Sequence, residues 1–220
     1  SYFNPDLPLK GKRVLITTGP TYEAIDPVRF IGNHASGKMG FALAEVAASL
    51  GAEVQLITGP THEKINHPSV AVQAVVSANE MFQAVKTEYK RSDIAIAAAA
   101  VADFTPQSVA PQKLKKGKSN LSLSLIPTED ILAYMGKNKK KHRLIGFALE
   151  TENELENAKI KLKQKNLDGI VLNSLQDPGA GFSVSTNKIT FIHSDHSIKT
   201  FPLQSKLECA HRIFEQILSL

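Results

Sequence analysis

The segment at residues 32–40 has the residue types and spacing of a phosphate-binding loop. Its letters are GNHASGKMG, and two glycines and a lysine stand where a P-loop has them. The hydroxyl residue that would hold magnesium is missing, because Met39 follows the lysine. A helix is expected to begin around Ser36, Gly37 and Lys38, and a helix N-terminus attracts anions. The segment therefore predicts an anion site or, as the simpler alternative, an ordinary capped helix start.

Lysine residues are concentrated in two further segments. Residues 112–119 (QKLKKGKS) contain Gly-Lys-Ser but lack the first glycine of a P-loop, and no helix pattern follows them. Residues 137–141 (KNKKK) are simplest to interpret as a solvated face. The formal net charge of +5 suits a phosphorylated substrate, and it would also suit nucleic acid. Neither segment is a complete P-loop, so both argue against ordinary P-loop kinase chemistry.

Short apolar runs alternate with helix-length segments along the chain. Continuous apolar runs are typical of parallel strands that are buried on both faces. The alternation predicts an α/β fold in a single domain over residues 1–220, with a Rossmann-like, doubly wound, mainly parallel sheet. Strands are expected at residues 13–17, 54–58, 70–75, 94–98, 144–148 and 169–172. Helices are expected at residues 38–50, 78–89, 130–137, 151–164 and 205–220.

Turn and cap residues separate these elements. The first two strands end in similar letters, VLITTGPT and VQLITGPT, as if adjacent strands ended in the same kind of turn. Ser77 and Thr128 are expected to cap the helices that follow them. Gly51 is expected to end the helix that precedes it.

Two segments depart from the alternation of strands and helices. Residues 119–125 alternate serine or asparagine with leucine, which is the period of a strand. Because they follow the lysine-rich loop between two α/β units, we expect a protruding β arm there. Residues 188–192 and 197–201 flank Ser194-Asp195-His196 and predict a C-terminal β-hairpin.

The overall composition is that of an ordinary soluble protein. Hydrophobic residues make up 42% and charged residues 21% of the 220 residues. No apolar run approaches the roughly 20 residues of a membrane span. The single cysteine, Cys209, excludes an internal disulfide framework, and no secretory signal opens the chain. We expect a cytoplasmic enzyme, and the initial Ser1 suggests a processed chain or a piece of a longer one.

Five segments form a pattern that extends along nearly the whole chain. In order they are GPTYEAIDPVRFIGNHASGKMGF at 19–41, AAAVADFTPQSVAPQKLKK at 98–116, DI at 130–131, GFA at 146–148 and AKIKLKQKNLD at 158–168. Together they resemble the phosphopantothenoylcysteine synthetase family, in the bacterial form often fused behind a phosphopantothenoylcysteine decarboxylase. The resemblance implies a ligase that joins 4'-phosphopantothenate to L-cysteine in coenzyme A biosynthesis. It further implies CTP as co-substrate, Mg²⁺ as cofactor, and either the synthetase half of a fused protein or a stand-alone version.

The resemblance also implies roles for individual side chains. Asn33 matches the asparagine that holds the acyl-cytidylate intermediate, and Lys113 matches the lysine of a mobile loop that neutralises charge on the α-phosphate. Without the resemblance, Asn33 would be a turn residue and Lys113 a solvated charge. Lys161 and Lys165 match a pair that reaches the phosphates, and their spacing places both on one helical face.

Further residues match the nucleotide contacts of the family. Small residues at a strand end allow a nucleotide to approach closely, and an aromatic ring there can pack on a base. The simpler alternatives are tight packing for the small residues, a core position for the ring and a turn cap for the aspartate. Arg29 is expected to hold the loop or the substrate phosphate, whereas no role is assigned to His34 and no metal ligand is assigned. The residues matching nucleotide contacts are Ala97, Ala98, Ala99, Asp103, Glu129, Asp130, Ile131, Leu132 and Phe147.

Family members form homodimers in which one subunit contributes to the other's site, and the arm at 121–125 is the expected contact. Two other functions remain as alternatives. A nicotinamide-dependent oxidoreductase would share the fold class, but the glycine fingerprint after the first strand is missing. A nucleic-acid-binding module would suit the lysines, but only Phe104 stands near the main lysine run. We therefore expect neither nucleic acid nor a membrane as a partner.

Overall fold

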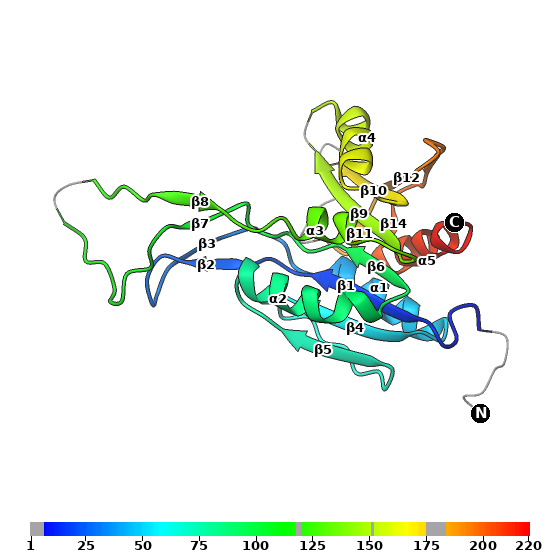
Figure 1. The fold of residues 1–220 in the computed structure, drawn as a ribbon, viewed down its shortest axis with the longest axis horizontal. Helices are drawn as coiled ribbons and strands as arrows, with labels where there is room; N and C mark the ends of the chain where they lie inside the picture. The colour runs from blue at the N-terminus through cyan, green and yellow to red at the C-terminus, as the bar shows by residue number, and fades with distance from the viewer. Residues whose placement is uncertain (1–6, 118–119, 151, 175–183) are drawn as a thin grey trace.

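The structure is a computed structural model that describes residues 7–117, 120–150, 152–174 and 184–220. An eight-stranded sheet with the order β13-β12-β10-β9-β6-β1-β4-β5 forms its centre (Figure 1). The six strands from β10 to β5 run parallel, as the sequence predicts. They are β1 (Arg13–Thr18), β4 (Glu53–Thr58), β5 (Val70–Ala74), β6 (Ile94–Ala97), β9 (Arg143–Glu150) and β10 (Gly169–Ser174).

Two antiparallel strands complete the sheet beside β10. β12 (Ile189–His193) pairs with β10, and β13 (Ile198–Thr200) pairs with β12. The C-terminal hairpin predicted from the sequence is therefore confirmed. A small separate ladder joins β11 (Thr186–Asn187) to β14 (Gln204–Ser205), and it was not expected.

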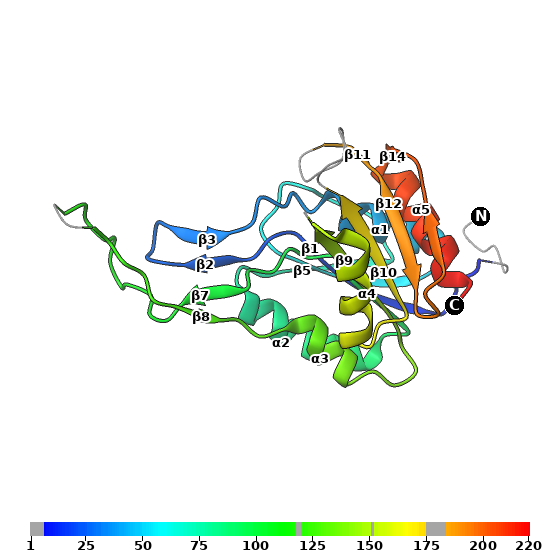
Figure 2. The ribbon, with the colours of Figure 1, turned by 90° about the horizontal axis from the view of Figure 1, so that it is seen from above.

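Helices cover both faces of the sheet, as in a doubly wound fold (Figure 2). On one face, α1 (Lys38–Ser49) and α5 (Lys206–Leu218) share a core cluster with Val14 of β1. On the other face, residues of α2 (Ala78–Glu88), α3 (Ile131–Lys137) and α4 (Glu154–Gln164) share a second cluster with Leu15. A short 3₁₀ helix, η1 (Tyr89–Arg91), follows α2. Burial of alternate β1 side chains on opposite faces explains the continuous apolar runs. None of the helices in the described ranges is both long and apolar enough to cross a membrane.

The helix caps agree with the sequence in two cases and differ in a third. Gly51, with φ 95°, follows the end of α1 as expected. Ser77 caps α2, because its side chain accepts a hydrogen bond from the N–H of Glu80. The prediction that Thr128 caps α3 is wrong, since Asp130 stands immediately before the helix and accepts from the Ala133 N–H at 2.8 Å. The Thr128 hydroxyl instead donates to the Ala102 carbonyl at 2.6 Å.

The helix expected at 151–164 begins later. α4 starts at Glu154, after Asn153, which has a left-handed backbone conformation with φ 47°. Residue 151 lies outside the described residues. A left-handed residue cannot continue a right-handed helix, so Asn153 fixes this boundary.

Two hairpins extend away from the sheet on the same side of the molecule (Figures 1 and 2). One consists of β2 (Tyr22–Ala24) and β3 (Phe30–Gly32), and the other of β7 (Phe104–Pro106) and β8 (Leu125–Pro127). The predicted arm exists, but the strand expected at 121–125 is misplaced and shares only its last residue with β8. A strand needs a partner as well as an alternating pattern, and the β7 ladder pairs with 125–127.

The carboxyl ends of β1 and β4 are joined by a close approach of two turns. The strands are adjacent and parallel, and Thr18 pairs with Thr58 in the register. The N–H of Gly59 donates to the Thr18 carbonyl at 2.9 Å. A Cβ atom at Gly59 would lie 1.6 Å from the Pro20 oxygen, so only glycine fits. The strands are adjacent as the repeated letters predict, but the expectation of the same kind of turn is wrong, because Gly19 has a left-handed φ of 74° and Gly59 is not among the glycines with positive φ.

Candidate functional site

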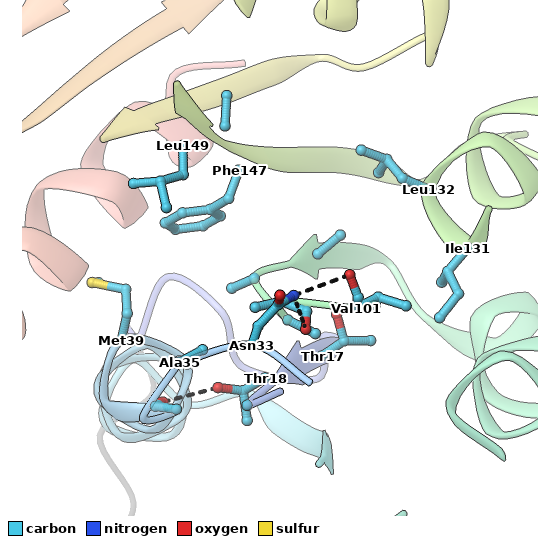
Figure 3. Close-up of a pocket in the computed structure, with 18 of the residues that line it drawn as sticks. Thr17, Thr18, Asn33, Ala35, Met39, Val101, Ile131, Leu132, Phe147 and Leu149 are labelled. Carbon is cyan, nitrogen blue, oxygen red and sulfur yellow. Dashed lines mark hydrogen bonds between the residues drawn. The ribbon is translucent and has the colours of Figure 1, made fainter. Parts of the chain in front are cut away.

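A cavity of about 900 Å³ lies at the carboxyl ends of β1, β6, β9 and β10 (Figure 3). This is the edge where open α/β sheets bind ligands, and the volume is within the range of small-molecule sites. Most of the site residues expected from the sequence line it. They are Asn33, Ser36, Gly37, Lys38, Ala97, Ala98, Ala99, Asp103, Glu129, Asp130, Ile131, Leu132, Phe147, Lys161 and Lys165.

The start of α1 forms one wall of the cavity. Gly37 has φ 84°, and its carbonyl accepts a hydrogen bond from the Thr18 hydroxyl at 2.9 Å. A Cβ atom at Gly40 would lie 2.1 Å from the same hydroxyl oxygen, so the helix rests directly on β1. Among the described residues no side chain caps α1. These contacts hold a helix N-terminus against the cavity, which is the geometry that suits an anion.

Asn33 connects two loops that are far apart in the sequence. Its side-chain nitrogen donates to the carbonyls of Ala100 at 3.0 Å and Val101 at 3.3 Å (Figure 3). These bonds attach the segment after β3 to the segment after β6 at the centre of the site. In this conformation the amide nitrogen already has two acceptors, so a ligand that accepts from Asn33 must share or displace them.

Lys161 of α4 and Lys165, the residue that follows α4, reach the cavity from the opposite face of the sheet. Lys161 donates to the Phe147 carbonyl at 2.9 Å, and burial lowers the pKa of its ammonium. Lys165 forms an ion pair of 2.6 Å with Asp130. Burial opposes the ionisation of Asp130, but hydrogen bonds from Lys165 and the Ala133 N–H lower its pKa overall. The site therefore combines a half-buried cation with a carboxylate held in its charged form.

Arg29 and Lys113 do not line this cavity. The Arg29 guanidinium donates to Asp26 at 2.6 Å and also to the Leu114 carbonyl. Asp26 is fully buried and accepts backbone hydrogen bonds from Val28 at 2.8 Å, Arg29 at 2.9 Å and Leu114 at 3.0 Å. Lys113 is exposed, one residue before the tethered Leu114. Arg29 thus contacts the lysine-rich loop and not the cavity wall.

The ionisation of Asp26 depends on these contacts. Burial by itself raises the pKa of a carboxyl group, because the charged form loses its water. The hydrogen bonds from Leu114, Val28 and Arg29 outweigh this effect and lower the pKa of Asp26 to about 2. The carboxylate is therefore charged at neutral pH and remains able to hold the loop.

Some residues that line the cavity were not predicted from the sequence. They come from the ends of β1 and β10, from β11 and from the start of α5. The position after an apolar strand is a signal that could have identified Asn173, whereas no local pattern distinguishes Lys206 from an ordinary surface lysine. The unpredicted residues include Thr17, Thr18, Asn173, Asn187 and Lys206.

Comparison with known proteins shows similarity along almost the whole chain. A model of the family described as the DNA/pantothenate metabolism flavoprotein C-terminal domain matches residues 9–220. The chain is 46% identical over 215 residues to the coenzyme A biosynthesis bifunctional protein CoaBC of Bacillus subtilis (strain 168), which covers 97% of this chain and 52% of that protein. The crystal structure of the C-terminal domain of a CoaBC protein is 42% identical, with a TM-score of 0.83 and 97% coverage of both chains.

A further relative has a different name. The chain is 53% identical over 214 residues to a cysteine/cysteine sulfinic acid decarboxylase of an unknown prokaryotic organism, covering 97% of this chain and 60% of that protein. The chain therefore spans about half to three-fifths of the length of these two curated relatives.

Proposed function

Since the chain belongs to the family of DNA/pantothenate metabolism flavoprotein C-terminal domains, we propose that it is a phosphopantothenate–cysteine ligase. It joins 4'-phosphopantothenate to L-cysteine, uses CTP and releases CMP and pyrophosphate. The observation that carries this proposal is the convergence of Asn33, the start of α1 and the pair Lys161 and Lys165 on one cavity at the strand ends. The likeness to the C-terminal domain of a bifunctional coenzyme A protein supports it.

In the first half of the reaction, a carboxylate oxygen of the substrate attacks the α-phosphorus of CTP. The bond from that phosphorus to the bridging oxygen breaks, and pyrophosphate leaves with the electron pair. Negative charge increases on the transferring phosphoryl group, so nearby cations and helix N–H groups stabilise the transition state. In this chain the start of α1 and Lys161 face the cavity, and Lys113 stands on the loop tethered by Arg29.

In the second half, the amine of cysteine attacks the acyl carbon of the acyl-cytidylate. The amide bond forms, the carbon–oxygen bond to CMP breaks, and the amine releases its proton to solvent. No nucleophilic side chain is needed, so the contribution of the protein is orientation. Asn33 joins two loops at the cavity, and we assign to its amide the role of holding the intermediate against the start of α1.

The nucleotide is held at the strand ends by small and aromatic residues. Ala97, Ala98 and Ala99 at the end of β6 permit close approach of the base or ribose, and Phe147 of β9 provides a ring on which the base packs. Asp103 and the segment from Glu129 to Leu132 line the same cavity. Asp130 is already charged and paired with Lys165, so a change at either residue would disturb the other.

The acidic residues of the cavity suit a magnesium ion that is bound mainly by the nucleotide. Within the described residues, no group of three or more His, Cys, Asp and Glu side chains could hold a metal ion. Mg²⁺ commonly uses one or two carboxylates together with substrate phosphates and water. Asp103 and Glu129 are the cavity carboxylates that we assign to this role, because Asp130 is paired with Lys165. When bound, Mg²⁺ would neutralise negative charge on the phosphates.

The protruding hairpins are the proposed homodimer contact. They carry exposed apolar side chains, including Leu121 with 61% of its surface exposed. An exposed apolar arm on a sheet is a liability unless another surface covers it. We also propose that this domain works beside a phosphopantothenoylcysteine decarboxylase, since the chain spans about half of a bifunctional relative. The exposed set is Val28, Phe30, Phe104, Leu121, Leu123, Leu125 and Ile126.

One assay tests the ligase activity and the preference for CTP. It also tests the alternative activity that the name of the decarboxylase relative suggests. The protein is mixed with 4'-phosphopantothenate, cysteine, Mg²⁺ and each nucleoside triphosphate in turn, and product mass and pyrophosphate release are measured. We expect the amide product with CTP, far less with ATP, and pyrophosphate only when the carboxylate substrate is present. Equal kcat/KM values for CTP and ATP would exclude the nucleotide assignment. Carbon dioxide released from cysteine, without any amide product, would exclude the ligase.

A further inference from the structure

Both backbone polar groups of Ala102 are bonded to threonine hydroxyls. Its N–H donates to the Thr21 hydroxyl oxygen at 2.9 Å, and its carbonyl accepts from the Thr128 hydroxyl at 2.6 Å. Thr21 lies between β1 and β2, and Thr128 lies between β8 and α3. Thr21 is fully buried and only 6% of Ala102 is exposed, so water cannot readily replace the Thr21 hydroxyl as an acceptor. Two segments that are distant in the sequence therefore meet at one alanine.

The bond to Thr21 continues a ladder that extends from the end of β1. Pro20 and Ala100 form a parallel bridge, and the N–H of Ala100 donates to the Gly19 carbonyl at 2.9 Å. Two residues further along each segment, the N–H of Ala102 donates to Thr21, but the acceptor is now a side chain. The backbone after Thr21 leaves this ladder to form β2. The hydroxyl therefore supplies the acceptor that the backbone no longer offers.

The residues on either side of Ala102 face the cavity. Val101 and Asp103 both line it, whereas Thr21 does not. The Val101 carbonyl is also one of the two acceptors of the Asn33 amide, at 3.3 Å (Figure 3). A movement of Ala102 would therefore move an acceptor of Asn33 and the backbone that carries the Asp103 carboxylate.

A second bond from Thr128 joins the two carboxylates to which we assign Mg²⁺. The N–H of Thr128 donates to the Asp103 carbonyl at 2.9 Å. The ladder of β7 and β8 continues from there, with Phe104 opposite Pro127. Glu129 follows Thr128 directly in the chain. Asp103 and Glu129 therefore stand on two backbone segments that are fixed to each other.

We propose that Thr21 is a positioning residue, which acts on the cavity through the backbone of Ala102. Its hydroxyl fixes the segment that holds the Asn33 amide and carries the Asp103 carboxylate. Thr128 holds the same backbone from the other side. This inference deepens the proposed ligase function and rests on it for the roles of CTP and Mg²⁺. The position of Asn33, however, can be measured without any ligand.

Three variants test this role. Thr21→Val keeps the shape of the side chain but leaves the Ala102 N–H buried without an acceptor, whereas Thr21→Ser keeps the hydroxyl. Thr58→Val is the matched control. Thr58 is also buried, with 5% of its surface exposed, its hydroxyl donates to the Gly59 carbonyl at 2.9 Å, and it does not line the cavity. Both valine variants lose one buried hydroxyl bond, so a difference between them is not a general loss of stability.

NMR of the protein without ligands reports the position of the segment directly. In Thr21→Val, we expect the side-chain amide signals of Asn33 to shift and the Ala102 amide to exchange about 10- to 100-fold faster. Thr21→Ser and Thr58→Val should keep both observables near the wild-type values. Unchanged Asn33 signals in Thr21→Val would overturn the proposal.

Titration calorimetry with CTP tests the consequence for the site. Residues that orient metal ligands typically change metal affinity by 10- to 100-fold when they are replaced. We expect Thr21→Val to weaken CTP binding by about this factor in the presence of Mg²⁺ and to leave it unchanged in EDTA. Equal weakening in both conditions would show a general structural effect and would overturn the positioning role.

Two further comparisons keep the test decisive. If thermal melting shows that Thr21→Val does not fold, Thr128→Val takes its place, and the Asn33 signals should shift in the same way. If the wild-type chain makes no amide but its Asn33 signals depend on Thr21, the positioning role stands and the ligase proposal falls. If amide forms and the Asn33 signals ignore both threonines, the ligase stands and the positioning role falls.

Discussion

The carboxylate of Asp26 accepts a hydrogen bond from the backbone N–H of Leu114 at 3.0 Å, although the two residues are 88 positions apart. The Arg29 guanidinium bridges the same carboxylate and the Leu114 carbonyl. A third bond, from the Ala110 N–H to the Ile25 carbonyl at 3.0 Å, joins the same two segments. The β2–β3 hairpin therefore holds the loop that carries Lys113.

The first prediction is that Asp26→Asn loosens this loop. A neutral amide loses the ionic attraction to Arg29 and accepts fewer backbone hydrogen bonds. We expect backbone hydrogen exchange over residues 110–117 to become about 10- to 100-fold faster, as each lost bond to a charged group implies. Asp195→Asn is the control, because that carboxylate accepts a hydrogen bond from the Ser197 N–H within the distant C-terminal hairpin. Unchanged protection of residues 110–117 would contradict the tether.

The second prediction concerns the pH at which the tether is lost. The pKa of Asp26 is about 2 in the folded chain, below the value of about 3.9 for an unfolded aspartate. A lowered carboxyl pKa stabilises the fold fully above about pH 4, and this contribution disappears as the pH falls through 2. In an NMR titration, the Leu114 amide signal should therefore shift with a midpoint near 2. A midpoint near 4 would show that the carboxylate is not held as described.

The third prediction concerns Lys113. If its ammonium neutralises charge in the first half-reaction, Lys113→Ala should slow acyl-cytidylate formation by about 10²- to 10³-fold. Rapid-quench measurement of pyrophosphate release reports this step directly. Lys116→Ala is the matched control, since Lys116 is also exposed on the same loop, and its rate should stay near the wild-type value. Equal rates for the two variants would remove Lys113 from the mechanism.

The fourth prediction separates the two half-reactions at Asn33. Asn33→Asp places a carboxylate next to the Ala100 and Val101 carbonyls and close to the phosphate of the intermediate. The first half should still release pyrophosphate, because Lys161 and the start of α1 are unchanged. Little amide should form when cysteine is added, and mass spectrometry of quenched mixtures should show the acyl-cytidylate or its hydrolysis product.

A remote asparagine provides the control for this change. Asn79 lies in the first turn of α2, where an added negative charge is tolerated, and Asn79→Asp should make amide at the wild-type rate. If Asn33→Asp itself formed amide at the wild-type rate, Asn33 would be only a turn residue without a role in the reaction.

The sheet could be predicted from the sequence because its strands are buried on both faces. The β1 letters are apolar at every central position, since Val14 faces one helix layer and Leu15 the other. The repeated glycine-proline turns likewise predicted the adjacency of β1 and β4. These signals are local, because each of them depends on residues that are neighbours in the sequence.

The hairpins and parts of the site depend on contacts between distant segments. The β2–β3 hairpin is held by stacking of Tyr22 on Phe30, with ring centroids 3.8 Å apart, and neither residue belongs to an alternating run. The capping role of Thr128 failed because its hydroxyl bonds to Ala102, which lies between β6 and β7 in the chain. Lys206 was missed for the same reason, because only the packing of α5 on α1 brings it to the cavity.

The packing of α5 on α1 also determines the stage of protein synthesis at which the site is complete. A ribosome releases β1 and α1 early, but α5 comes last among the elements described here. Until α5 docks, the wall formed by Lys206 is absent and the part of α1 that packs on α5 is uncovered, although β1 and β4 already pack against the rest of the helix. A nascent chain therefore cannot bind the proposed nucleotide in the mature way before α5 has docked. Nucleotide binding would consequently be a sign that translation has passed α5.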